Sequence, residues 1–175
     1  MRSQLKAQPL CGKPLSGIFT GPDKYLTLQD LTIREQTPPA AEDDSLFIYV
    51  TSGSGHLTVN GVVFDLTAGS FCWLQSYHVF SLTPAWGSTL ELQVLVYDYP
   101  LSSYMTYRSN QSANLTAFSP GMPVYPLSSD RKARVEELLH EFRLYNDLQG
   151  AGPNLIKCAI LGQLSNLFVE LLENT

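Results

Sequence analysis

The stretch from Leu46 to Phe80 constrains the fold of this chain most, because short apolar runs alternate in it with turn residues at close, regular spacing. The runs cover residues 46–50, 57–59, 62–66 and 71–74, and the turns between them are Gly53-Ser54-Gly55, Asn60-Gly61 and Ala68-Gly69. The Asn-Gly pair is typical of a two-residue type I′ hairpin turn, in which both central residues take a positive φ. Strands this short and evenly spaced predict a small β-barrel or sandwich, which holds either a packed interior or one small ligand.

The regions around this stretch differ in composition and divide the chain into three predicted parts. Residues 1–23 contain three prolines and are expected to form an irregular arm. Residues 24–128 are expected to form the barrel, from a first strand Tyr25–Glu35 to a last strand Leu90–Tyr97, followed by a wrapping segment rich in Ser, Tyr and Pro. Residues 129–175 are predicted to form a helical hairpin.

Charge and cysteine content limit the partners and the compartment of the chain. Its formal net charge is −5, and the 11 basic residues are scattered, whereas a nucleic-acid-binding surface shows a basic patch. The three cysteines are odd in number and far apart, which favours thiols in a reducing compartment. The N-terminus lacks a signal-peptide apolar core, and no apolar run has membrane-spanning length. These features predict a cytoplasmic chain that does not bind DNA or a membrane by itself.

The C-terminal hairpin combines helix-end signals with an apolar stripe. Ser129 is the predicted N-cap of the first helix, and Asp130 follows in the first turn, where the helix dipole favours an acid. Gly150-Ala151-Gly152 ends that helix, and Pro153 suits the first position of the second. The second helix has an apolar face so wide that either its own barrel or a second copy of the chain must cover it. For a homodimer, the predicted interface is Ile156, Ile160, Gln163, Leu164, Leu167 and Leu171.

The order of these parts resembles the ligand-sensing half of AraC-type transcription regulators. The resemblance is carried by Tyr49–Gly55, by Leu66–Ser70 and by Tyr77–Phe80, followed by the last strand and the hairpin in the family's order. It implies a mainly β fold, a cupin-like barrel of the jelly-roll type, followed by an antiparallel helical hairpin that dimerises. In that family a separate C-terminal domain with two helix-turn-helix motifs binds DNA. The chain is therefore expected to be the effector-sensing and dimerisation domain of a longer regulator, with that DNA-binding part beyond Thr175.

The alternative hypothesis is a catalytic cupin, and the number and spacing of the histidines argue against it. Metal-dependent cupins bind their ion through a His-x-His pair, a nearby Glu and a later His, because several such ligands must converge on one centre. The chain has three histidines, His56, His78 and His140, no two of which are close in sequence. We therefore predict no enzyme activity, no metal and no cofactor. A stand-alone cupin isomerase or dioxygenase and a ligand-free dimerisation module remain the alternatives.

Candidate ligand-binding residues come from the strands of the predicted barrel. Arg34 would grip a carboxylate or hydroxyls if it points inward, and it is solvated if it does not. By the resemblance, the pocket-facing row of the last strand is Gln93, Leu95 and Tyr97. Gln93, Leu95 and Phe80 depart from the residues of sugar-sensing relatives, which argues against a plain sugar and for a pocket with fewer polar anchors or no effector. The expected effector classes are a sugar, a sugar acid or a small aromatic or apolar metabolite. The full predicted set is Arg34, Tyr49, Trp73, His78, Phe80, Gln93, Leu95 and Tyr97.

Overall fold

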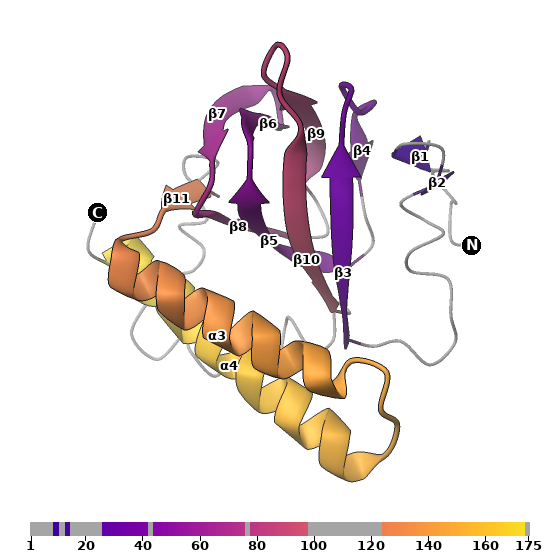
Figure 1. Ribbon diagram of the computed structural model, residues 1–175, viewed down its shortest axis with the longest axis vertical. Coiled ribbons are helices and arrows are strands. Elements are labelled where there is room, and N and C mark those ends of the chain that lie inside the picture. Colours follow the sequence, from indigo (N-terminus) through magenta and orange to yellow (C-terminus); the bar gives the residue numbers. More distant parts are fainter. Residues whose placement is uncertain are drawn as a thin grey trace.

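The fold consists of two antiparallel sheets and a helical hairpin, as shown by a computed structural model (Figure 1). The structure describes residues 9–10, 13–14, 26–41, 44–75, 78–97 and 124–173. Most of the predicted arm and the whole segment between Tyr97 and Val124 lie outside the described residues. The division into three parts therefore stays a prediction, although the strand region and the hairpin are both present.

The larger sheet has five strands in the order β11-β8-β5-β10-β3. Its strands are β3 (Leu26–Ile33), β5 (Ser45–Ser52), β8 (Ser70–Leu74), β10 (Leu90–Tyr97) and β11 (Val124–Pro126). Neighbouring strands pair antiparallel, with Val94 of β10 opposite both Ile48 of β5 and Gln29 of β3. The predicted first and last strands of the barrel are therefore adjacent in this sheet.

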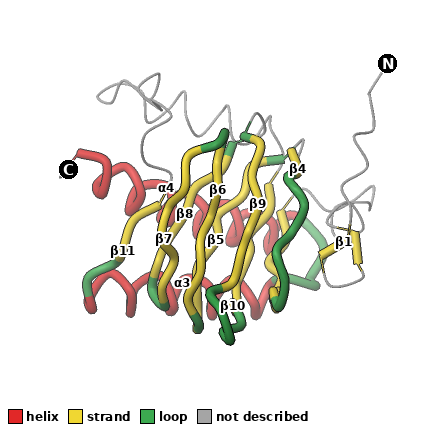
Figure 2. The backbone as a smooth tube through the Cα atoms, turned by 90° about the horizontal axis from the view of Figure 1, so that it is seen from above, coloured by secondary structure: helices red, strands yellow, loops and turns green. Residues whose placement is uncertain are grey.

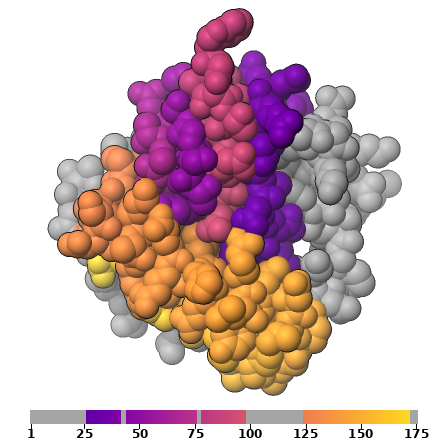
Figure 3. All heavy atoms as spheres, in the orientation of Figure 1, coloured from indigo at the N-terminus to yellow at the C-terminus, as the bar shows by residue number. Residues whose placement is uncertain are grey.

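The smaller sheet has four strands in the order β4-β9-β6-β7. Its strands are β4 (Ala40–Ala41), β6 (Ser54–Val59), β7 (Val62–Thr67) and β9 (Val79–Pro84). A separate two-stranded ladder joins β1 (Pro9–Leu10) to β2 (Lys13–Pro14). The turn between β9 and β10 projects beyond the rest of the molecule in Figure 3, and its Trp86 side chain is fully exposed.

Two turns of the Leu46–Phe80 stretch need backbone conformations that favour glycine. Asn60 and Gly61 both have positive φ, at 49° and 84°, which confirms the predicted two-residue turn between β6 and β7. Gly53 has a φ of 88°, and a Cβ atom on it would lie 1.8 Å from the carbonyl oxygen of Thr89. Backbone from the β9–β10 side thus approaches Gly53 too closely for any side chain.

The sheets pack face to face over an apolar core, and this arrangement confirms the predicted fold class. Strands of both sheets contribute to the core, because alternate side chains of each strand point to one face. Its fully buried members include Ile48, Val50, Leu57, Leu66, Leu90 and Leu92. The strand order is consistent with a cupin-like jelly-roll. The described strands form a sandwich of two separate sheets and not one closed barrel.

The helical hairpin covers the face of the five-stranded sheet that lies away from the four-stranded sheet (Figures 1 and 2). It consists of α3 (Ser129–Tyr145) and α4 (Ala151–Glu173). The predicted N-cap is wrong by one residue, because Ser128 is the N-cap and Ser129 already belongs to the helix. Helix α4 likewise begins at Ala151, so Pro153 lies within its first turn rather than at its first position. Asp130 is in the first turn of α3, as predicted.

Candidate functional site

The five-stranded sheet separates two buried regions, and the predicted ligand-binding residues are divided between them. One region is the core between the sheets, which contains Phe80 together with Leu92, Val94 and Val96 of β10. The other lies between the same sheet and the helices, and we call it the hairpin-side cluster. Its sheet residues are Leu26, Leu28, Phe47, Tyr49, Phe71, Trp73, Leu95, Tyr97 and Tyr125, and its most buried helix residues are Val135, Leu138, Phe142, Ile160, Leu161, Leu164 and Phe168.

The row of β10 that faces the interior of the sandwich differs from the expected one. Leu95 and Tyr97 belong to the hairpin-side cluster, whereas Leu92 and Val94 line the core between the sheets. The expectation that the Gln93 row points into the sandwich is therefore wrong. Glu91 and Gln93 alternate with Leu90, Leu92 and Val94 in β10, and it is the apolar row that faces the core, so the expected row came from the family resemblance and not from the strand's own pattern. The ligand-binding roles of these residues stay predictions.

Aromatic rings dominate one end of the hairpin-side cluster. Phe168 of α4 places its ring 5.3 Å from that of Trp73 and 5.2 Å from that of Tyr125, both edge-on. The same ring lies 5.7 Å from the ring of Phe71 and 6.2 Å from that of Phe47. These distances and the edge-on geometry fall in the favourable range for aromatic pairs. Phe168 thus anchors the C-terminal half of α4 on the strands β5, β8 and β11.

Polar contacts fasten α3 to the same sheet. The Tyr49 hydroxyl donates to a carboxylate oxygen of Glu136 over 2.6 Å. Burial raises the pKa of the Tyr49 hydroxyl, and the neighbouring Glu136 carboxylate raises it further, so Tyr49 stays neutral as a hydrogen-bond donor. The Leu28 N–H donates to Asn146 Oδ1 over 2.8 Å, just beyond the end of α3. The middle of α3 and its C-terminal end are therefore tied to sheet strands.

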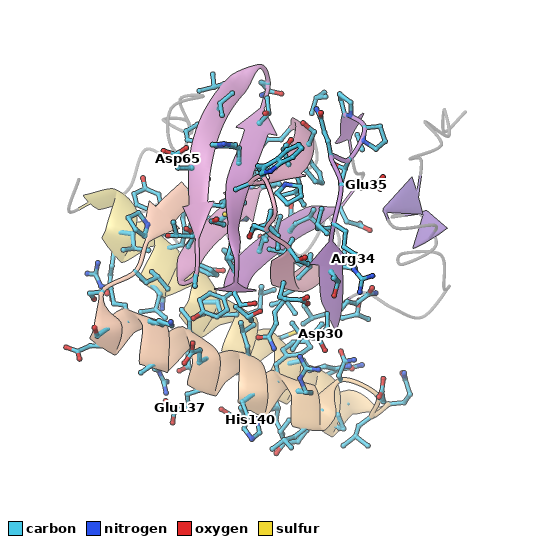
Figure 4. All side chains as sticks on the ribbon, turned by 45° about the horizontal axis from the view of Figure 1, so that its top comes forward. Asp30, Arg34, Glu35, Asp65, Glu137 and His140 are labelled. Carbon is cyan, nitrogen blue, oxygen red and sulfur yellow. The ribbon has the colours of Figure 1, made fainter. Side chains whose placement is uncertain are left out.

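An ion pair adds a third attachment between α3 and the sheet. Arg143 donates through both terminal nitrogens to the Asp30 carboxylate, at 2.5 and 2.6 Å. The hydrogen bond from Arg143 holds the pKa of Asp30 below its ordinary value, and Gln93 adds a further hydrogen bond to that carboxylate. Figure 4 labels Asp30, which lies within β3, near the helices. Gln93 thus belongs to a polar contact at the sheet–helix junction.

Arg34 and His78 lie away from the hairpin-side cluster. Arg34 follows the last residue of β3, and its side chain is exposed at the edge of the sheet (Figure 4). His78 is buried next to Gln75, whose backbone N–H donates to His78 Nδ1 over 3.1 Å. Burial lowers the pKa of the His78 imidazole, so its neutral form is favoured. The eight predicted ligand-binding residues therefore do not converge on one place in the fold.

Most of the predicted dimer residues turn toward the protein's own sheet. Ile160, Leu164 and Leu171 are buried in the hairpin-side cluster, and Ile156 and Leu167 are partly buried against it. Gln163 is exposed and accepts a hydrogen bond from Arg134 of α3. The wide apolar stripe of α4 is thus largely accounted for within one chain, and its role in a dimer stays a prediction.

Lys157 is a buried cation that sequence reasoning missed. Its side chain is 5% exposed, and its Nζ atom lies 3.4 Å from the carbonyl oxygen of Leu148. The signal was present in the sequence, since Lys157 precedes Ile160, Leu161 and Leu164 at the spacing of one helix face. A lysine on an apolar helix face is unusual, because lysine is rarely buried without a charged partner.

Metal-binding groups do not gather in the described part of the chain. There, no three His, Cys, Asp or Glu side chains are placed to hold an ion. His56 Nδ1 lies 3.0 Å from Asp65 Oδ1, but both side chains are exposed on the four-stranded sheet, and His140 is exposed on α3. Cys72 is buried, and that burial raises the pKa of its thiol, which disfavours the thiolate that a metal would need.

Comparisons with known proteins identify relatives at the level of family and fold. A family model described as an AraC-like ligand binding domain matches residues 26–148. A crystal structure of a ligand-free ToxT variant from Vibrio cholerae resembles the chain with a TM-score of 0.61 and 13% identity, covering 87% of this chain and 58% of that one. A cupin protein from Bacteroides fragilis is similar with a TM-score of 0.38 and 16% identity, over 42% of this chain and 64% of that one.

The likeness to solved structures concerns the fold, because the identities are low. The polyketide cyclase RemF from Streptomyces resistomycificus gives a TM-score of 0.38 at 20% identity, over 41% of this chain and 53% of that one. The chain thus spans less than two thirds of the length of each of these three structures. No curated protein matches the chain. In the described residues, no helix is both long and apolar enough to cross a membrane.

Proposed function

The chain belongs to the family of AraC-like ligand-binding domains, and we propose on this basis that it senses a small-molecule effector and dimerises as part of a transcription regulator. The observation that carries the proposal is the family match, which spans both sheets and α3. In this proposal, effector binding controls attached helix-turn-helix domains. The sequence of the gene beyond Thr175 tests that control directly, since a pair of helix-turn-helix motifs is expected there and a stop codon would contradict it.

The five-stranded sheet could transmit a change on effector binding to the helical hairpin, because it contacts both buried regions. One face of β5 and β10 lines the interior of the sandwich, and the other face carries the helices. A ligand that moves these strands therefore also moves the surface on which α3 and α4 pack. For regulation, the ligand must bind two arrangements of the hairpin with different affinity.

The effector is proposed to be a sugar, a sugar acid or a small aromatic or apolar metabolite. The aliphatic and aromatic character of both buried regions favours a ligand with an apolar body. Melting temperatures of the purified chain, measured with a panel of these compounds, test the proposal, because a ligand that binds the native state stabilises it. At least one compound is expected to raise the melting temperature in a concentration-dependent manner. No response to any class would favour a ligand-free module instead.

The proposed homodimer uses the outward face of α4. Between Ala151 and Val169 the one charged residue is Lys157, whose side chain is buried, so the exposed surface of this stretch is uncharged. A charge placed there would be desolvated in an interface between two copies. Ala159→Glu is therefore expected to shift the mass in light scattering from dimer to monomer, whereas Ala133→Glu on the exposed face of α3 leaves it unchanged. A monomeric wild-type chain at micromolar concentration would refute the dimer.

A cupin enzyme is the competing function, and metal content separates it from the proposed regulator. Cupin enzymes of the metal-dependent type need three or four ligands on one ion. We expect the purified chain to contain no stoichiometric iron, manganese or zinc by elemental analysis. A stoichiometric amount of any of these metals would favour the enzyme.

A further inference from the structure

Lys157 places a positive charge where the fold otherwise puts apolar side chains. Its side chain is 5% exposed, and it lies one turn before Ile160 and Leu161, which are buried in the hairpin-side cluster. Lysine is almost never fully buried unless it is paired, because moving an ammonium group out of water without a partner is costly. The position therefore calls for an acceptor.

The described residues supply only a weak acceptor for this ammonium. Its Nζ atom donates to the carbonyl oxygen of Leu148 over 3.4 Å, longer than a typical charged hydrogen bond. None of the ion pairs within the described part of the chain includes Lys157. An ammonium group has three N–H donors, and a single long bond to a carbonyl leaves most of that capacity for another group. The Leu148 contact also holds the lysine near the connection between α3 and α4.

We propose that Lys157 anchors the carboxylate of a small organic acid whose apolar body packs against the hairpin-side cluster. The inference rests on the proposed effector-sensing function and names the ligand class of that domain. One buried ammonium balances one negative charge, so a monocarboxylate is matched, whereas a dianion such as a phosphate monoester would bring an excess buried charge. The cluster residues one turn from Lys157, Ile160 and Leu161, are aliphatic and buried, and they favour an apolar body over a polyhydroxylated one.

The ligand would also connect the two helices. Its carboxylate would meet Lys157 of α4 next to the carbonyl of Leu148, which follows α3. Binding at this point changes the contacts at the turn of the hairpin, where the relative position of α3 and α4 is set. The site thus links the charge of the effector to the geometry of the hairpin.

The test compares benzoate with benzamide, which has nearly the same shape but no negative charge, and adds hexanoate as an aliphatic monocarboxylate. Melting temperatures and calorimetric titrations of the full chain are measured for wild type, Lys157→Met, Lys157→Arg and the control Lys132→Met, which removes a half-exposed lysine of α3. Methionine keeps much of the apolar stem of the lysine, and far-UV circular dichroism of each variant without ligand checks its fold.

We expect benzoate to raise the wild-type melting temperature and benzamide to leave it unchanged. Lys157→Met should weaken benzoate binding by at least about tenfold, since a charge-assisted hydrogen bond is worth roughly a tenfold change or more. Lys157→Arg should keep part of the binding and Lys132→Met all of it. If hexanoate, in place of benzoate, stabilises the wild type and loses binding in Lys157→Met, the apolar body of the ligand is aliphatic and Lys157 still anchors its carboxylate.

Other outcomes separate this inference from the proposed function. Equal responses to benzoate and benzamide, or equal benzoate binding by wild type and Lys157→Met, would overturn the carboxylate anchor. A sugar that stabilises the chain while neither acid does would overturn it too, yet leave the effector-sensing function intact. If Lys157→Met fails to fold, the amide resonances of Leu148 and Lys157 in the wild type decide, because they should shift with benzoate and stay in place with benzamide.

Discussion

Replacing Phe168 with Ala should loosen α4 from the sheet and cost a large part of the stability of the chain. The side chain is fully buried, and its ring lies within 5.2–6.2 Å of the rings of Phe47, Phe71, Trp73 and Tyr125. A buried Phe→Ala change costs about 3–5 kcal/mol through lost transfer energy and the cavity left behind. Because three of the four ring pairs are nearly edge-on, we place Phe168→Ala at about 4 kcal/mol.

Phe168→Leu separates the aromatic contribution from simple burial. Leucine retains much of the buried apolar area but lacks the ring, so its cost should be about 1–2 kcal/mol. Leu155→Ala on the exposed face of α4 is the matched control, because this side chain is 71% exposed and its loss should cost less than about 0.5 kcal/mol.

Urea unfolding of these variants, followed by tryptophan fluorescence, measures the costs. A Trp86→Phe background makes the signal report on Trp73 alone, since these are the two tryptophans of the chain and Trp86 is fully exposed. A cost below about 1 kcal/mol for Phe168→Ala would refute the claim that this ring anchors the hairpin, because the lower bound for a buried Phe→Ala change is about 3 kcal/mol.

Three further predictions concern charge and backbone. Asp30→Asn should lower the free energy of unfolding at pH 7 by no more than about 1 kcal/mol, since the ion pair with Arg143 is exposed. Because the pKa of Asp30 is lowered in the folded state, this difference should disappear as the pH falls from about 3.9 through that lowered pKa, as measured by urea unfolding at each pH. His78→Asn should reduce the loss of melting temperature below about pH 6.5, because there the unfolded imidazole binds its proton before the buried one does. Gly61→Ala should destabilise the chain by about 1 kcal/mol, because the φ of Gly61 is positive. Gly152→Ala should stabilise it by about the same amount, because Gly152 lies in α4 with open space around it. Equal effects of the two variants on urea unfolding would contradict the role given to backbone conformation.

Most strand positions could be predicted from the sequence, because the turns between strands contain characteristic residues such as Asn-Gly. The predicted strand Leu90–Tyr97 matches β10 residue for residue, and Asn60-Gly61 forms the predicted turn. The first residue of α3 could not be predicted from the sequence, since Ser128 and Ser129 are both suitable N-caps and only their φ and ψ angles distinguish them.

The sequences of β5 and β8 do not show which face of each strand points inward, for a physical reason. All residues of β8 and the first six of β5 are buried, because one face packs on the other sheet and the opposite face packs on the helices. Alternation between apolar and polar residues, which normally shows the inward face, is therefore absent. The same covering explains the apolar stripe of α4, which packs largely on its own sheet.

Hydrogen exchange of the hairpin, with and without the compound that raises the melting temperature most, tests the central claim that effector binding is coupled to the helices. The amides of α3 and α4 report on local opening of the hairpin, and those of β5 and β10 report on the shared sheet. The account predicts changed exchange rates in the strands and in both helices on ligand binding. Changes confined to the strands, with unaltered rates throughout α3 and α4, would contradict it.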